Sequence, residues 1–587
     1  EGDAWELSRP ITKSDLPSSI QEVISARLDR LEKHTKRLLQ EASVIGRAFL
    51  YDVLKRVTVS SENLGEHLSV LEHLDLIRVS AVHPDLEYVF KHALIQDVVY
   101  NGLLKKERKA IHERIGLAME KIFQHRIFEF YETLAFHFKH GQSGFKAVNY
   151  LIKSGEKSLD RYALDEAHDY FGEAFDLLAN KPHRSQQENE LFIDLISRWF
   201  LVFYYRGDFS SMVDLLSSNK GLAESLGDGS RLGMFYACLA FTLYWGQEKL
   251  RESYQLLKQA YALGEKMGHP KVMGYAATWL SWVCADLGLF SEGLKYGETA
   301  QALSGELSED QYLHFKSLAG IGHNYWQMGE GKKDIAIGKA LQTYGKKHSN
   351  VRSIVTGHIV EAAGHFALGD FTQAIRCAKN GIEGAADPFY DQWAKIALSI
   401  SFVFQTIKFA EAGELLEEVL SYSRESGCNY LKSMADLFMG VLLIAKGQMN
   451  RGLAMIKEVH AASLKNERVT LLVVTEYILG RIFLQIAQPD KPVNFPTIAK
   501  NLGFLVMNVP FAAKKAETHL LKAIKTAERI GARGILGQAS LDLGLLKKKR
   551  GKTEEARKLI DKAISIFETM EAEVFLKIAR ESLQAKN

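Results

Sequence analysis

Proline and cysteine are scarce in this sequence, and both shortages narrow its fold class. Only 10 prolines interrupt 587 residues, and aliphatic, Ala, Glu and Lys residues recur at helical spacing, which predicts a nearly all-α protein. The cysteines lie far apart, without CxxC or paired Cys/His spacing: Cys238, Cys284, Cys377 and Cys428. This spacing predicts reduced core residues and contains no zinc motif, so we expect no metal site.

Excess charge and long apolar runs are also missing. The 74 Lys and Arg residues nearly balance 71 Asp and Glu residues, and the net charge of +3 favours neither a nucleic acid nor a membrane partner. No apolar run reaches the ~18 residues of a spanning helix. The N-terminus, Glu1-Gly2-Asp3, lacks a signal-peptide pattern. We therefore expect a cytoplasmic protein, in a sequence that begins inside a longer natural chain.

Catalytic motifs are absent as well. A phosphate-binding loop requires GxxxxGK[ST]; Gly551-Lys552-Thr553 has the right ending, but the nearest upstream glycine, Gly544, is out of register. The sequence contains no GxSxG and no HExxH, and His137 and His140 have no further ligand at suitable spacing. We expect neither enzyme activity nor a bound cofactor in this segment.

The sequence does contain an internal repeat. In a tetratricopeptide repeat (TPR), small residues at fixed positions let two antiparallel helices approach closely, and the last copy matches with Gly544, Ala556 and Ala563. Residues equivalent to Ala556 recur along the chain: Met212, Ser253, Gly293, Asp334, Ala374, Ala412, Gly452 and Ala516. Their spacing is about 40 residues, longer than in a plain TPR, with one interval of 64. The period predicts a TPR-like α-solenoid superhelix.

The interval of 64 residues contains proline-rich turn signals at 488–492 and 508–510. They predict an irregular insertion at 487–512, which separates a TPR-like superhelix at 121–486 from C-terminal TPR-like repeats at 513–587. The helix phase between 125 and 185 stays open, because repeat-like residues there lie too close together for the period.

Residues 16–120 follow a different pattern, which predicts a winged-helix-like module. Four short amphipathic helices are expected, followed by a hairpin of two strands at 76–80 and 87–90. Such modules often read DNA through one helix, here expected at 61–75. That helix is acidic, with Glu62, Glu66, Glu72 and Asp75. Phosphates would repel these side chains, so we expect a packing role and no nucleic acid partner.

Two segments resemble the STAND class of signal-transduction ATPases: LPSSIQEVISARLDRLEKHTKRLLQEASVIGRAF at 16–49 and YVFKHALIQDVVYNGLL at 88–104. The resemblance is closest to the branch in which a class III adenylate or guanylate cyclase domain, an ATPase domain, a winged helix and a TPR array follow one another. It implies that residues 1–15 end an upstream ATPase domain, which binds ATP or ADP and is a partner of this segment. The repeats also resemble the superhelical sensor arm of maltose-regulator-type STAND proteins.

The resemblance gives one residue a role. Phe90-Lys91-His92 falls where the family's winged helix presents a His, similar to the Met-His-Asp motif of plant immune receptors, which touches the β-phosphate of bound ADP. This sequence has the His without the Met or the Asp. His92 is therefore the candidate nucleotide sensor, since imidazole can donate to a phosphate oxygen. The alternative is a structural residue at a strand-to-helix junction.

TPR geometry also predicts which side chains face the concave groove: Trp245, Tyr275, Trp282, His323 and Trp326. Aromatic side chains offer large contact areas and suit capture of a peptide, a helix or a small ligand. The alternative is that these rings pack between helices. We expect a sensor region that binds a protein or small-molecule ligand in the groove and couples it to the upstream nucleotide-binding and output domains. The rival reading is a constitutive TPR scaffold without switching.

Overall fold

The computed structural model describes residues 18–58, 63–307, 310–488 and 501–584. Contacts divide the chain into two compact units, Glu1–Glu188 and Asn189–Asn587. The sequence predicted that the winged-helix-like module extends to 120, and the helix Lys105–Ile122 packs on that module. The first unit therefore contains that module together with the first helical hairpins.

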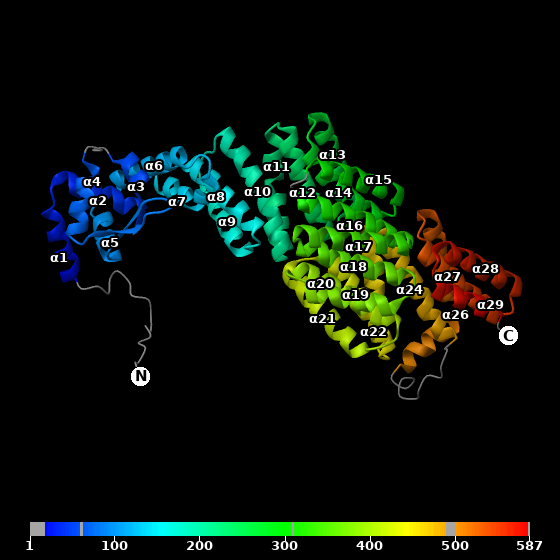
Figure 1. Ribbon diagram of the computed structural model, residues 1–587. Helices are drawn as coiled ribbons and strands as arrows, with labels where there is room; N and C mark the ends of the chain where they lie inside the picture. Colours follow the sequence, from blue (N-terminus) through cyan, green and yellow to red (C-terminus); the bar gives the residue numbers. More distant parts are fainter. Residues whose placement is uncertain (1–17, 59–62, 308–309, 489–500, 585–587) are drawn as a thin grey trace, which may run out of the picture. The chain divides into compact units, whose positions relative to one another are not determined.

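The winged-helix-like module has the four helices and the hairpin that the sequence predicted, and a short third strand at Ala48–Leu50 joins the hairpin (Figure 1). Its elements are α1 (Ser18–Asp29), α2 (Lys33–Ile45), β1 (Ala48–Leu50), α3 (Tyr51–Val57), α4 (Leu64–His73), β2 (Ile77–Ala81), β3 (Glu87–Phe90) and α5 (Ala93–Asn101). The antiparallel sheet has the order β1-β3-β2, with Tyr88 opposite both Phe49 and Val79. Leu39, Leu54 and Phe90 are buried in one hydrophobic core, which explains the amphipathic pattern of these helices.

Helical hairpins complete the first unit. They comprise α6 (Lys105–Ile122), the short η2 (Ile127–Phe130), α7 (Tyr131–His140), α8 (Gly144–Asp160) and α9 (Leu164–Ala179). α6 contacts α2 and α3, and each of α7, α8 and α9 packs on the preceding helix. Small residues permit this close packing, since a Cβ at Gly155 would lie 2.9 Å from the Phe171 ring. These helices resolve the phase that the sequence left open between 125 and 185.

The second unit is a TPR-like superhelix of antiparallel helix pairs (Figure 1). Its first part comprises α10 (Gln186–Arg206), α11 (Phe209–Ser225), α12 (Gly229–Gln247), α13 (Leu250–Met267), α14 (Pro270–Leu287), α15 (Phe290–Glu306), α16 (Gln311–Met328), α17 (Gly331–His348), α18 (Val351–Ala367) and α19 (Phe371–Gly384). The second part comprises α20 (Pro388–Phe404), α21 (Phe409–Ser426), α22 (Asn429–Ala445), α23 (Met449–Lys465), α24 (Val469–Ala487), α26 (Leu502–Ile530), α27 (Arg533–Lys549), α28 (Thr553–Met570) and α29 (Glu573–Gln584). The period of about 40 residues is confirmed.

Local signals start and stop these helices. The Asp310 and Asp370 side chains accept hydrogen bonds from backbone N–H groups in the first turns of α16 and α19. Within each hairpin, small residues let the helices touch: a Cβ at Gly440 of α22 would lie 2.9 Å from the carbonyl oxygen of Gly452 in α23. This close approach is the physical basis of the small-residue pattern read from the sequence.

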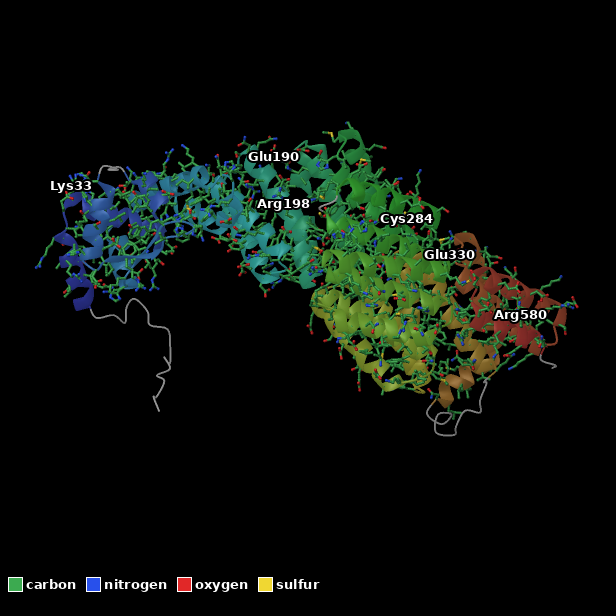
Figure 2. All side chains as sticks on the ribbon, in the orientation of Figure 1. Lys33, Glu190, Arg198, Cys284, Glu330 and Arg580 are labelled. Carbon is green, nitrogen blue, oxygen red and sulfur yellow. The ribbon has the colours of Figure 1, made fainter. Side chains whose placement is uncertain are left out.

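Helices five hairpins apart also touch, because the superhelix returns onto itself after one turn. α12 contacts α22, α14 contacts α24 and α16 contacts α27. At one such point Gly329, with a φ of 83°, lies so close to α27 that an added Cβ would be 2.7 Å from the backbone nitrogen of Gly534. The adjacent Glu330, labelled in Figure 2, forms an ion pair with Arg533. We term these interactions the turn contact.

One predicted segment differs in the structure. Residues 489–500 of the expected irregular insertion lie outside the described residues, whereas 502–512 belong to the helix α26, which runs through Pro510. The expectation of irregular structure at 502–512 is therefore wrong. Proline removes one hydrogen bond, but burial of Phe504 and Ala512 on the two sides of Pro510 offsets that loss.

Two predictions about apolar residues can be compared with the structure. All four cysteines are buried free thiols, as predicted, and Cys284 is labelled in Figure 2. Within the described residues, α24 is a helix long and apolar enough to cross a membrane, although 61% of that window is buried inside the protein. Its Glu476 accepts hydrogen bonds from His460 and His519 at 2.9 and 2.6 Å, so α24 packs here as a core helix.

Candidate functional site

A cavity of about 70 Å³ lies inside the second unit. Its walls come from α14, α16, α18, α20 and α22, which are the first helices of five consecutive hairpins, together with the start of α17. One full superhelical turn therefore surrounds it. The volume exceeds what one water molecule needs by several fold, so the cavity can hold a small chemical group.

Aromatic rings dominate the wall of this cavity. Five lining residues carry large rings: Trp282, Trp326, Phe366, Trp393 and Tyr430. Trp282 and Tyr430 are buried, whereas Trp326, Phe366 and Trp393 are partly exposed. Part of the aromatic wall is therefore accessible to solvent.

Two polar side chains interrupt the apolar wall. Asp334 is fully buried, and neither of its carboxylate oxygens has a hydrogen-bond partner among the described residues. His323 stacks on Trp282, with ring centroids 4.8 Å apart. Its Nε2 likewise makes no hydrogen bond within the described residues and lies 3.5 Å from Oδ1 of Asp286. A buried polar group without a partner costs about 1–3 kcal/mol, so the Asp334 oxygens mark a place where a ligand would be stabilised.

Burial raises the pKa of Asp334 well above its ordinary value of 3.8. Asp334 lies in the first turn of α17, and its Oδ1 would be 3.0 Å from a Cβ added at Gly322 on α16. The side chain is thus held between two helices in apolar surroundings. Its neutral acid form is favoured until a group that stabilises the carboxylate arrives.

The groove residues predicted from the sequence divide into two sets. Trp282, His323 and Trp326 line the cavity. Trp245 is fully buried behind it, with its ring 5.6 Å from that of Trp393, and Tyr275 packs on Tyr312 away from the cavity. Neither Trp245 nor Tyr275 lines this cavity, and a binding role for the five residues stays a prediction. The tight superhelix makes inner positions of neighbouring hairpins pack on one another.

Beside the cavity, a group of aromatic side chains surrounds the amine of Lys316. The Lys316 Nζ lies 4.9–6.0 Å from the centres of seven rings: Tyr204, Trp279, Trp282, Phe315, Phe389, Tyr390 and Trp393. Burial lowers the pKa of this amine well below its ordinary value. Trp282 and Trp393 belong to both the Lys316 surroundings and the cavity wall, so the two sites share walls.

The cavity is also next to a buried ion cluster of the turn contact. Arg468, at the start of α24, donates to Glu248 at 2.7 Å, and its Nε lies 3.8 Å from Asp286 at the end of α14. Although burial alone would raise it, the charges of Arg468 and His323 hold the pKa of Asp286 below its ordinary value. His323 thus faces both the cavity and the turn contact.

In the first unit, the candidate nucleotide sensor His92 is exposed between β3 and α5. Its side chain makes no capping hydrogen bond to α5. The position agrees with a strand-to-helix junction and leaves the imidazole accessible. Its role in sensing nucleotide stays a prediction.

One group of side chains within the described residues has the spacing of metal ligands: Glu361, His365 and Cys377 lie with their ligand atoms within 4.8 Å of one another. The Glu361 carboxylate already accepts a hydrogen bond from Gln342 at 2.7 Å. Burial raises the pKa of the Cys377 thiol to about 11, which disfavours the thiolate that a metal needs. We therefore assign no metal to this group.

Sequence reasoning missed two key residues of the cavity, Asp334 and Trp393. Asp334 did carry a signal, because it is the only charged residue at the repeat position otherwise occupied by small or apolar side chains. A carboxyl at a position that faces a partner helix must be buried. Trp393 carried no comparable signal, since it lies at a partly exposed position of α20.

The fold and the cavity together define a TPR-like α-solenoid that surrounds an aromatic pocket. No family model matches the chain. Over 185 residues it is 28% identical to an uncharacterized protein of Rhizobium meliloti (strain 1021); the match covers 30% of this chain and only 17% of that protein.

Several solved structures have similar helical folds. A STAND protein with a TPR sensor from Pyrococcus horikoshii is 14% identical, with a TM-score of 0.37 over 74% of this chain and 68% of that one. A Rap protein complexed with Competence and Sporulation Factor is 13% identical, with a TM-score of 0.46 over 65% and 99%. The Rap conjugation gene regulator of plasmid pLS20, in complex with the Phr* peptide, is 12% identical, with a TM-score of 0.41 over 63% and 96%. The fold assignment rests on this chain's own hairpins.

Proposed function

We propose that this chain is the sensor region of a STAND-type signalling protein and that its superhelix binds a small ligand in the aromatic cavity. One observation carries the proposal: a pocket walled by five large rings contains a fully buried carboxyl group without a hydrogen-bond partner among the described residues. Apolar pockets with a few convergent polar groups are typical ligand sites. The volume of about 70 Å³ favours a small molecule, or a single side chain of a peptide, over a whole helix.

Ligand binding would be relayed through His323. This residue lines the cavity and lies 3.5 Å from Asp286, whose charge is balanced by Arg468 of the next superhelical turn. A ligand that draws His323 toward the cavity changes the field at Asp286 and so the stability of the turn contact. A ligand shifts such an equilibrium only by its differential affinity for the two arrangements.

The proposal for the rest of the signalling protein follows from the sequence resemblance at 16–49 and 88–104. In this proposal, an upstream ATPase domain binds ATP or ADP, His92 senses its phosphate, and the output domain is a nucleotide cyclase in the cytoplasm. The superhelix itself has a sensing role and no catalytic one. The alternative is a scaffold that holds proteins together without switching.

A blocked cavity tests the sensor proposal against the scaffold. Ala363 lines the cavity on α18, and Ala363→Trp should fill it, whereas Ala367→Trp places the same bulk on the same helix outside the lining residues. Compounds that raise the Tm of the chain should lose this effect in Ala363→Trp and keep it in Ala367→Trp. In the full-length protein, the same compounds should alter nucleotide exchange. A ligand that binds without any change in exchange would favour the scaffold.

A further inference from the structure

We propose that the ligand of the aromatic cavity is an organic cation, an ammonium group carried on a small apolar body. The inference rests on the proposed function and names the chemical class that this site takes. It is carried by two features of the cavity wall, its rings and its single carboxyl group.

The rings provide a surface that attracts positive charge. Trp282, Trp326, Trp393 and Tyr430 are residue types that bind cations well, and they come from four different helices. Trp326 and Trp393 are partly exposed. The buried Tyr430 ring already has the Arg468 guanidinium 3.7 Å from its centre, which shows that the rings of this wall accept a cation. Rings on several sides stabilise an alkylated ammonium group, which has little to gain from hydrogen bonds and can bury its methyl or methylene groups at the same time.

Asp334 supplies the counter-charge. Its two oxygens have no hydrogen-bond partner among the described residues, and the side chain is fully buried in the cavity wall. An ammonium group that enters the cavity would pair with the carboxylate in a medium of low dielectric, where attraction between opposite charges is strong. An anionic ligand would instead meet a carboxyl group and the negative faces of the rings.

The neighbouring Lys316 shows what the rings do without such a carboxylate. This amine is surrounded by seven rings, and its Nζ has no hydrogen-bond partner among the described residues. Asp387, the acid whose charge acts on this amine, is already paired with Arg352 at 2.7 Å. Lys316 thus shows an amine surrounded by aromatic rings alone. The adjacent cavity has aromatic rings together with the Asp334 carboxyl group, which can pair with the charged nitrogen of a ligand.

A sugar fits the wall less well. Sugars need several hydrogen-bonding partners around the ring, and a site built for them leaves unpaired polar groups when they are absent. Among the described residues, the Asp334 oxygens have no hydrogen-bond partner, whereas His323 faces Asp286 at 3.5 Å and the Ser401 hydroxyl donates to the carbonyl of Ala397. The balance of many rings with one acid favours a cation with an apolar body.

Matched pairs of charged and uncharged compounds test the inference by isothermal titration calorimetry on the whole chain. Choline is compared with 3,3-dimethylbutan-1-ol, in which an uncharged carbon replaces the nitrogen. Isobutylammonium is compared with isobutanol. At least one cation should bind about tenfold or more tightly than its neutral partner. Asp334→Asn should bring the ratio close to one, whereas Asp214→Asn, which removes an exposed acid on α11, should leave it unchanged.

The outcomes separate this inference from the proposed function. If the neutral and the charged compound of each pair bind equally, and Ala363→Trp blocks the binding of both, then the cavity is a ligand site and the cation proposal is wrong. Absence of binding by both cations would also overturn the cation proposal, whatever a wider compound screen finds. If Asp334→Asn keeps full preference for the cation, Asp334 is not the counter-ion. Circular dichroism checks that each variant has the helix content of the parent.

Discussion

The turn contact and the cavity both bury ionisable side chains, but the surroundings of those side chains differ. At the turn contact, Arg468 is matched by Glu248 and Asp286 from hairpins of the preceding turn. In the cavity wall, Asp334 has no partner among the described residues. Paired buried charges fix one geometry, since removing either partner leaves the other unsatisfied. A buried carboxyl group without a partner adds nothing to the stability of the fold, and this is why our proposal gives Asp334 a role in binding.

The largest expected effect comes from breaking the paired charges. Arg468→Met should lower the free energy of unfolding by about 3–5 kcal/mol, because Glu248 and Asp286 then stay buried without their counter-ion. Urea unfolding measures the change. Arg557→Met, at a side chain on α28 that is 70% exposed, should change stability by less than about 0.5 kcal/mol. A loss below about 1 kcal/mol for Arg468→Met would show that the turn contact is not held by this cluster.

A backbone change tests the same contact without altering charge. Gly329→Ala should cost about 2–3 kcal/mol, because Ala disfavours the φ of 83° and its Cβ would lie 2.7 Å from the Gly534 nitrogen. Gly305→Ala on α15, where nothing lies within 4 Å of an added Cβ, should be neutral or stabilising. Thermal unfolding of both variants provides the measurement. Equal Tm values for the two would contradict a close approach of successive turns.

Removing the carboxyl group from the cavity wall should stabilise the fold, in contrast to the two changes at the turn contact. Asp334→Ala should raise the free energy of unfolding by about 1–3 kcal/mol, since it removes a buried carboxyl without a partner. The reverse change, Ala374→Asp at the equivalent position of the next hairpin, should destabilise the fold. Urea unfolding without ligand checks both. A stability loss in Asp334→Ala would mean that the carboxyl supports the fold, and its assignment to binding would fail.

The last prediction is a pH dependence, whose effect over a single pH unit is the smallest of the four. Because the pKa of Asp334 is raised in the folded chain, folded protein holds a proton that unfolded chain releases above its ordinary pKa of 3.8. Stability from this residue therefore falls as pH rises from that value to the folded pKa, by about 1.4 kcal/mol per pH unit. Asp334→Asn should lose this slope, so its stability relative to the parent should grow with pH. Parallel stability–pH curves would contradict the buried, unpaired state.

Much of the architecture was predictable from local pattern. Small residues such as Gly440 and Gly452 recur because two helices touch there, so the period of about 40 residues predicted the hairpins correctly. The expectation of irregular structure at 502–512 was wrong because it relied on a local signal. Pro510 favours a turn, but burial of Phe504 and Ala512 outweighs this preference. Three of five expected groove residues line the cavity. Trp245 and Tyr275 do not, because the neighbours of these side chains depend on how tightly the superhelix winds.

The sequence by itself determined the helices, their pairing into hairpins and the winged-helix-like module, since each depends on residues close together in the chain. Only the tertiary structure decided which side chains meet after a full turn, such as Arg468 with Glu248, 220 residues away. It also decided that Asp334 has rings and no partner around it. Contacts between distant hairpins depend on the sum of small rotations at every repeat, and no single segment of sequence encodes that sum.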